Sequence, residues 1–112
     1  MIKVVWFLKK AKHLSMEEFR YWWINEHAPQ VASKQGAMLR RYIVNIRHDN
    51  DNLPGVPESL FDWDGMAEEW FSSTEAARAA FSLPSALETR ADVMQHVDKI
   101  SRCIVDEHYI IE

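Results

Sequence analysis

The chain has 112 residues, of which 47% are hydrophobic and 12% aromatic, and its net charge is −4. This length fits a single domain over residues 1–112 and leaves no room for a second one. The 13 lysines and arginines are scattered, which excludes a broad cationic surface for nucleic acid, and no stretch approaches the roughly 20 apolar residues of a membrane span. We therefore expect a small molecule or another protein as the partner.

The first strand and the first helix are predicted from apolar patterning. Ile2–Leu8 is β-branched and aromatic on both alternating faces, which indicates a strand covered on both sides. A helix is expected over Ser15–His27, because Ser15 and Glu18 form a capping box at its start. Phe19, Arg20, Trp23 and His27 recur along one face of this helix at three- and four-residue steps. The His27 imidazole should therefore project from an apolar stripe.

The middle of the chain predicts a pair of strands. Pro29 disfavours helical geometry at Ala28 and so ends, kinks or restarts the first helix, and Gly36 closes the segment. Strands are expected over Leu39–His48 and Met66–Phe71. The loop between them, Asp49–Asp62, is long enough to close over a pocket as a lid.

Two helices and a last strand complete the pattern. Ser72 and Glu75 repeat the capping-box spacing and open an alanine-rich helix anchored by Phe81. A third helix is expected over Ser85–Val97 and a last strand over Cys103–Ile111. The residues expected to face inward on the third helix are Leu87, Ala91 and Met94.

The element order βαββααβ predicts an α+β protein with a ferredoxin-like split βαβ arrangement. Its four-stranded antiparallel sheet should carry helices on one face and leave the other open. An open face this rich in apolar residues would expose a large patch, so we expect a homodimer.

Strand alternation suggests a buried carboxyl group in a pocket. If Phe71 packs under the alanine-rich helix, Glu69 faces the helices too, with His27 opposite. Desolvation would raise the pKa of Glu69, and a nearby imidazolium would lower it. Either balance yields a proton shuttle near neutrality, beside which Tyr42 could donate a hydrogen bond to an enolate or phenolate oxygen.

Structural roles remain open for the same residues. His27 could simply cap helix carbonyls, and Glu69 could form an ion pair with Arg20 or Arg78. Tyr42 could be a core or interface aromatic. Cys103 on an apolar strand suggests a buried, inert thiol.

Composition argues against bound metals and nucleotides. The five histidines show no His-x-x-x-His spacing, and the single cysteine gives no Cys-x-x-Cys pair. The three glycines are too far apart for a phosphate-binding loop. No internal disulfide can form and no signal-like segment starts the chain, so a cytoplasmic location is expected.

Two motifs carry a family resemblance. Phe19-x-Tyr21-Trp22-x-x-x-x-His27-Ala28-Pro29, together with Asp64-Gly65-Met66-Ala67-Glu68-Glu69-Trp70-Phe71-Ser72-Ser73 and the alanine-rich helix, resembles the EthD-like family of dimeric α+β barrel proteins. The resemblance implies homodimers whose sheets face each other, with a pocket between sheet and helices in each protomer. Members and relatives include methylmuconolactone isomerases, fungal polyketide decarboxylases and dehydratases, and small proteins encoded beside ether-degrading oxygenases, and most of the enzymes use no cofactor.

The isomerase resemblance also implies site residues. His27 falls near the family's helix histidine and Tyr42 at a strand tyrosine, while Glu69 stands where the isomerases have a cysteine. That departure replaces thiol-assisted proton transfer with a His/Glu acid-base pair. The expected substrate-binding residues are Trp6, Arg20, Trp23 and the loop histidine His48.

The leading functional hypothesis is a cofactor-free lyase or isomerase acting on a small aromatic, polyketide-like or lactone metabolite. One alternative is a non-catalytic carrier of a hydrophobic ligand in an oxygenase pathway. Another is a haem-dependent monooxygenase, which would need an axial ligand such as His27.

Overall fold

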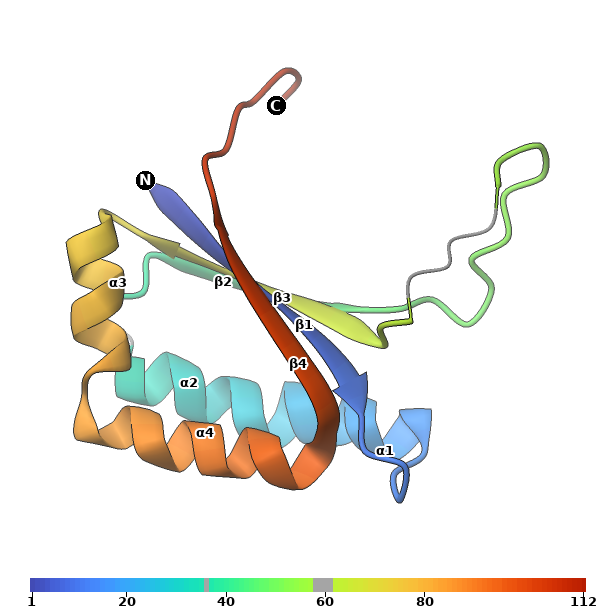
Figure 1. The fold of residues 1–112 in the computed structure, drawn as a ribbon, viewed down its shortest axis with the longest axis horizontal. Helices are drawn as coiled ribbons and strands as arrows, with labels where there is room; N and C mark the ends of the chain where they lie inside the picture. Colours follow the sequence, from blue (N-terminus) through green and yellow to red (C-terminus); the bar gives the residue numbers. More distant parts are fainter. Residues whose placement is uncertain (36, 58–61) are drawn as a thin grey trace.

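A computed structural model describes residues 1–35, 37–57 and 62–112 of the chain. It shows a four-stranded antiparallel sheet with all of its helices on one face (Figure 1). The elements in chain order are β1 (Ile2–Lys10), α1 (Met16–Tyr21), the π-helix η1 (Trp22–His27), α2 (Ala28–Gln35), β2 (Arg41–Ile46), β3 (Gly65–Phe71), α3 (Thr74–Phe81), α4 (Pro84–His96) and β4 (Val97–Val105). The strand order β2-β3-β1-β4 confirms the predicted ferredoxin-like fold.

The capping box predicted at the start of the first helix is present. The Glu18 amide donates to the Ser15 hydroxyl, and the Glu18 carboxylate accepts from the Ser15 amide. The helix then widens into η1 before Pro29 and restarts as α2 at Ala28, whose backbone remains helical. Restarting was one of the three outcomes expected at Pro29. The prediction for Gly36 lies outside the described residues.

The second capping box was predicted one residue too early. The cap of α3 is Ser73, whose hydroxyl accepts from the Ala76 amide. Three residues after this serine stands an alanine, so the helix start has one side-chain bond and no reciprocal carboxylate. Phe81 does anchor this helix, since its ring packs against Phe71 and Trp6 at centroid distances of 5.6 and 5.7 Å.

The predicted inward face of α4 was wrong for Leu87 and Ala91. Leu87 is 67% exposed and Ala91 is also exposed, whereas Met94, although 65% exposed, lines the cavity between the helices and the sheet. Ala86 and Thr89 are the buried positions. The helix is therefore rotated by about one residue relative to the prediction, because its apolar side chains do not form one continuous stripe.

The last strand begins earlier than predicted. It follows α4 without a loop at Val97 and ends at Val105, so most of Cys103–Ile111 is an extended tail. As an edge strand with mostly exposed side chains, β4 lacks the apolar alternation that marked the other strands. Cys103 is correspondingly exposed, which corrects the expectation of a buried thiol.

The face of the sheet that packs against helices, here called the helix-covered face, holds the core. One buried cluster centres on Phe19, Trp22 and Trp23, and a second joins Phe71 to the alanines of α3. Gly65 allows this packing, because a Cβ at that position would lie 2.4 Å from Cζ3 of Trp23 and 2.8 Å from the carbonyl oxygen of Asn45.

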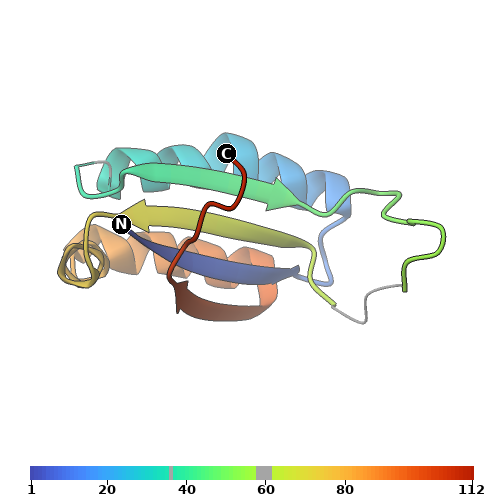
Figure 2. The same cartoon turned by 90° about the horizontal axis from the view of Figure 1, so that it is seen from above.

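The opposite face, here called the open face, carries no helix from the described residues. The tail after Val105 rises from this side of the sheet (Figure 1) and passes above the strands in the view of Figure 2. It is attached through Glu107, which accepts a hydrogen bond from Trp70 Nε1 at 2.7 Å. Lys3 pairs with Glu107 and with Glu68, each at 2.8 Å. One end of the open face is therefore charged rather than purely apolar.

The long loop between β2 and β3 extends away from the helices (Figure 1). Part of the predicted lid, residues 58–61, lies outside the described residues. None of the described residues in 47–57 or 62–64 lines the large cavity of the protein. Within the described ranges, no helix combines the length and apolar character needed to span a bilayer.

Candidate active site

A cavity of about 810 Å³ lies between the helix-covered face and the helices. The floor of the cavity consists of two rows of cross-strand neighbours. The first row is Ile104, Val4, Glu69 and Tyr42, and the second is Arg102, Trp6 and Ala67. Side chains from η1, α2, α3 and α4 form its walls. The cavity opens between α4 and β4, where its lining residues Met94, Ile100 and Ile104 are exposed.

Glu69 is a carboxyl group inside this cavity and is only 5% exposed. Phe71 packs under α3, so strand alternation places Glu69 on the helix-covered face. Burial raises the pKa of Glu69 to about 7, although a hydrogen bond from the Trp6 indole opposes the shift. Neither of the predicted arginine partners pairs with it. Glu69 therefore populates both protonation states near neutral pH.

Tyr42 lies next to Glu69 on the adjacent strand. Its hydroxyl oxygen accepts a hydrogen bond from Trp23 Nε1 at 3.3 Å. Burial raises the pKa of Tyr42, so the hydroxyl keeps its proton throughout the physiological range. Its own O–H has no acceptor among the described residues and is available to a ligand oxygen.

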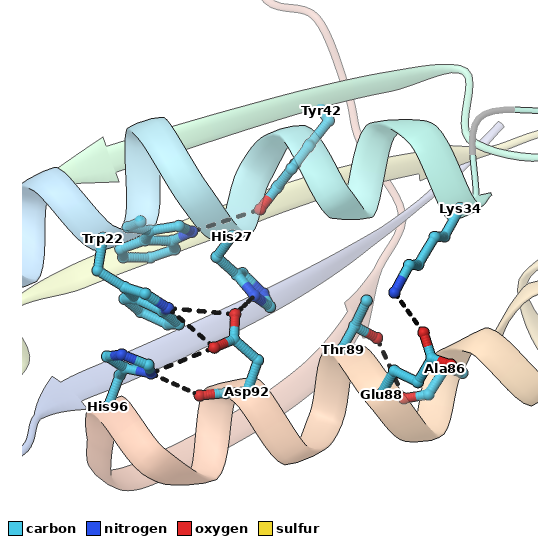
Figure 3. A network of polar contacts seen from close by, with 10 residues as sticks. Trp22, His27, Lys34, Tyr42, Ala86, Glu88, Thr89, Asp92 and His96 are labelled. Atoms are coloured by element: carbon cyan, nitrogen blue, oxygen red, sulfur yellow. Dashed lines mark hydrogen bonds and ion pairs between the residues drawn. The ribbon is translucent and has the colours of Figure 1, made fainter.

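His27 is buried at the junction of η1 and α2 and lines the cavity. Its Nδ1 lies 2.8 Å from Oδ2 of Asp92, which reaches across from α4 (Figure 3). Because a carboxylate accepts, Nδ1 carries the proton and Nε2 holds the free lone pair. Burial lowers the pKa of His27, with the Asp92 hydrogen bond opposing, so the ring is held neutral as a base.

Asp92 connects a stack of three rings. It also accepts from Trp22 Nε1, at 3.1 Å to Oδ2 and 3.2 Å to Oδ1. Trp22 stacks on His27 at a centroid distance of 4.9 Å and on His96 at 4.2 Å. His96 Nδ1 donates to the backbone carbonyl of Asp92 at 2.7 Å. The orientation of the His27 ring is thus set by one carboxylate and one indole.

The π-helix makes this stack possible. Trp22 and His27 are five residues apart, and in a regular α-helix that spacing would turn them about 140° away from each other. In η1 the Ala28 amide bonds to the Trp23 carbonyl, five residues back, so residues at this spacing align. Pro29 follows directly and has no amide to donate, and its ring would clash with a carbonyl in a regular α-helix.

The structure brings together five of the seven predicted site residues. His27, Glu69, Tyr42, Trp6 and Trp23 all line the cavity. Arg20 does not, because its guanidinium points to Asp49 with a separation of 3.6 Å. His48 is also absent from the cavity, since it is exposed and its Nδ1 lies 3.0 Å from the Asn50 carbonyl oxygen.

Sequence reasoning missed Asp92 as the partner of His27 and placed Glu69 in that role. Among the described residues, no hydrogen bond joins His27 and Glu69. The available signal was Asp92 followed four residues later by His96 on one helix. This spacing does not reveal that Asp92 faces His27, because the apolar residues of α4 do not mark its inward face.

Within residues 1–35, 37–57 and 62–112, no group of three histidine, cysteine or acidic side chains is arranged to hold a metal ion. The polar groups that line the cavity instead suit proton transfer and hydrogen bonding to an organic ligand. Trp6, Trp23 and Phe81 supply aromatic walls around them.

Comparison with solved structures shows the same fold over nearly the full chain. One similar structure is an EthD family protein from Bacillus halodurans, with 19% identity, a TM-score of 0.73, and coverage of 96% of this chain and 99% of that chain. SnoaB, a cofactor-independent oxygenase from Streptomyces nogalater, has 12% identity, a TM-score of 0.71, and coverage of 98% and 95%. A protein from Arabidopsis thaliana has 16% identity, a TM-score of 0.70, and coverage of 100% of both chains.

Comparison with curated proteins gives no match. The family model described as the EthD domain matches residues 11–100, a range that includes the π-helix, Glu69 and Asp92. The chain therefore belongs to the EthD family.

Proposed function

We propose that the protein is a cofactor-independent lyase or isomerase. Its reaction would be a tautomerisation, dehydration or decarboxylation of a small aromatic, polyketide-like or lactone metabolite. The observation that carries this proposal is Glu69, a buried carboxyl group with no cationic partner among the described residues and a pKa of about 7. Structural carboxylates are usually buried with a cation, whereas a carboxyl group of this kind is suited to giving and taking a proton.

The three polar groups take different roles. The free Nε2 of His27 removes a proton from the substrate, and Tyr42 donates a hydrogen bond to the oxygen that becomes negative. Glu69, in its protonated form, gives a proton to a second position, which leaves His27 as an imidazolium and Glu69 as a carboxylate. Proton exchange with water then restores both groups, so the net charge is conserved over one tautomerisation. Asp92 touches no substrate in this scheme and acts as a positioning residue for His27.

The proposal is tested by a screen of phenolic acids, muconolactones and polyketide-like aromatics, read first by thermal shift and then by product analysis. A ligand that stabilises the protein and is converted by wild type, but not by the Glu69→Gln variant, is the expected result. A ligand converted equally by both would remove Glu69 from the mechanism. Added haemin serves as a control, because a Soret band from a stable complex would contradict cofactor-free chemistry.

A carrier function is the second candidate. It is favoured by the walls of the cavity, where aliphatic and aromatic side chains outnumber polar ones. In that case a ligand would stabilise the protein and be recovered unchanged, and the Glu69→Gln and His27→Ala variants would bind it as wild type does.

We also propose that two copies associate through the open face and that the protein is cytoplasmic. No helix of the described residues covers the open face, and a tail with exposed Ile110 and Ile111 rises from this side of the sheet. A solved structure from Bacteroides fragilis with this type of fold, at 10% identity and a TM-score of 0.55, is described as dimeric. Light scattering during size-exclusion chromatography should give twice the mass of one chain, and a monomer at micromolar concentration would overturn the dimer.

A further inference from the structure

We infer that the ligand of the cavity carries a carboxylate, which Arg78, Arg90 and Arg102 bind at the cavity mouth. These arginines come from α3, α4 and β4, and all three line the same cavity. The inference rests on the proposed function in that it names the substrate class of the same site.

None of these arginines has a carboxylate partner among the described residues. Elsewhere on the molecule cations pair readily, as Arg20 does with Asp49 and Arg47 with Asp51. Arg78, Arg90 and Arg102 are exposed and enter no such pair. Their guanidinium groups therefore remain available for an anion that comes from outside the chain.

The charge balance of the cavity also favours an anionic ligand. The whole chain has a net charge of −4, yet the charged residues that line the cavity are three arginines and one glutamate. The glutamate is Glu69, which lies on an interior strand, while Arg102 lies on the edge strand β4. The mouth is therefore positive in a protein that is negative, and this contrast attracts anions in preference to neutral molecules.

The arginines are connected to the proposed catalytic groups through neighbouring side chains of the sheet. Arg102 is the register neighbour of Trp6, and the Trp6 indole hydrogen bonds to Glu69. Exposed Ile100 and Ile104 lie on either side of Arg102 on the same face of β4. A ligand with its carboxylate on Arg102 would thus lay an apolar body along Trp6 towards Glu69 and Tyr42.

Tyr42 shows that the interior also binds a polar group of the ligand. Tyr42 lines the cavity, and its hydroxyl accepts a hydrogen bond from Trp23 Nε1, while its own O–H has no acceptor among the described residues. A ligand oxygen next to Glu69 would accept this hydrogen bond. A ligand that offers a carboxylate to the arginines and an oxygen to the polar interior is a hydroxylated aromatic or polyketide-like acid.

The test uses unreactive probes, so that binding is measured independently of turnover. Isothermal titration calorimetry would compare 2-naphthoate, its neutral isostere 2-naphthamide and the cation 2-naphthylmethylammonium. We expect wild type to bind naphthoate at least about tenfold more tightly than naphthamide, because hydrogen bonds to charged groups are the stronger ones. The cation should bind most weakly.

Substitutions of the arginines show which side chains cause the preference for naphthoate over naphthamide. Each of Arg78→Gln, Arg90→Gln and Arg102→Gln should reduce the preference for naphthoate, and the triple variant should bring it to within about twofold of naphthamide. Arg40→Gln is the control, since Arg40 lies outside the cavity. Thermal unfolding of every variant checks that it is folded, and Arg→Lys replacements, which keep the charge, should retain part of the preference.

Equal affinity of wild type for the acid and the amide would overturn the inference. So would an undiminished preference in a folded triple variant, or a loss of the same size in Arg40→Gln. Competition by inorganic phosphate but not by benzoate would replace the carboxylate with a phosphate. The Glu69→Gln variant should keep the preference for naphthoate while losing turnover, so failure of the proposed chemistry and failure of this inference give different results.

Discussion

The two faces of the sheet place neighbouring glutamates of β3 in opposite environments. Glu68 on the open face is desolvated, but hydrogen bonds from Lys3 and Asn45 outweigh that effect and lower its pKa. Glu69 on the helix-covered face is buried without a cation, and its pKa rises to about 7. One step along a strand therefore separates a structural ion pair from a group able to exchange protons at neutral pH.

The same contrast extends to what each face contacts. The open face uses its charges internally, since Lys3 bonds to Glu68 and to Glu107 of the tail. The cavity between the helix-covered face and the helices leaves Tyr42 and three arginines with bonding capacity that the described residues do not use. Unused polar groups around a cavity are a better guide to a binding site than charge alone.

Exchanging the two glutamates for glutamine gives the largest expected difference. Glu69→Gln should reduce turnover of a true substrate by roughly 10²- to 10⁴-fold, the usual contribution of a general acid or base. Glu68→Gln is the matched control and should leave turnover nearly unchanged, because its side chain lies on the other face. Similar losses of turnover in both variants would show that the two glutamates do not differ in function.

The pH dependence of stability should separate the glutamates by sign. The folded-state pKa of Glu69 lies above the ordinary value of 4.5, so its contribution is complete below that value and is lost as the pH rises to about 7. The loss should be on the order of 3 kcal/mol. Urea unfolding of wild type and Glu69→Gln at several pH values measures it.

For Glu68 the sign is reversed, because its pKa is lowered and its contribution is lost as the pH falls. The difference in unfolding free energy between wild type and Glu68→Gln should therefore shrink in acid.

For Glu69, the contradicting result is a constant difference in unfolding free energy between wild type and Glu69→Gln from acid to neutral pH. That result would show that Glu69 is not desolvated.

Removing the partner of His27 tests the positioning role of Asp92. Asp92→Asn should lower turnover on the order of 10²-fold, because a misplaced base loses its approach to the substrate. In the pH-rate profile, the limb that reports protonation of His27 should also move to lower pH. Burial lowers the pKa of His27 and the Asp92 hydrogen bond raises it, so loss of that bond leaves the effect of burial unopposed. A folded variant with an unshifted profile would assign Asp92 a packing role.

Glu88→Gln is the control on the same helix. Glu88 forms an exposed ion pair with Lys34 and does not line the cavity. Its loss should change neither turnover nor the pH profile.

Two glycines should give the smallest effects and differ in cause. Gly65→Ala forces a Cβ against Trp23 and the Asn45 carbonyl, and should destabilise the fold by about 1–3 kcal/mol. Gly55→Ala meets no atom within 4 Å but requires a positive φ of 82°, which costs about 1–2 kcal/mol. Denaturant unfolding compares them, and only Gly65→Ala should also weaken ligand binding, because Trp23 lines the cavity.

Much of this architecture follows from local sequence rules. The capping box at Ser15, the apolar β1 and the alternation that turns Glu69 towards the helices were predictable, because each depends on neighbours in the chain. The contact between Asp92 and His27 was not, because it joins residues 65 positions apart on helices whose relative rotation is set by packing. The π-helix was also hidden, since Pro29 signals a disturbance without specifying its form.

The bounds of the edge strand β4 could not be predicted, for a different reason. β4 is held by backbone hydrogen bonds to β1 and buries few side chains, so its sequence carries little periodic signal. The tail, in which Tyr109, Ile110 and Ile111 are exposed, has a more strand-like apolar sequence than β4 itself. The arginines at the cavity mouth were equally invisible as a group, because they are 24 positions apart in sequence from Arg78 to Arg102.

The most direct test of Glu69 as a proton-exchanging acid is the titration of its carboxyl carbon by ¹³C NMR, with Glu69→Gln used to assign the signal. We predict a midpoint at about pH 7. A midpoint near the ordinary value of 4.5 would contradict it, because Glu69 would then be an ordinary carboxylate and the helix-covered face would hold no proton-exchanging acid.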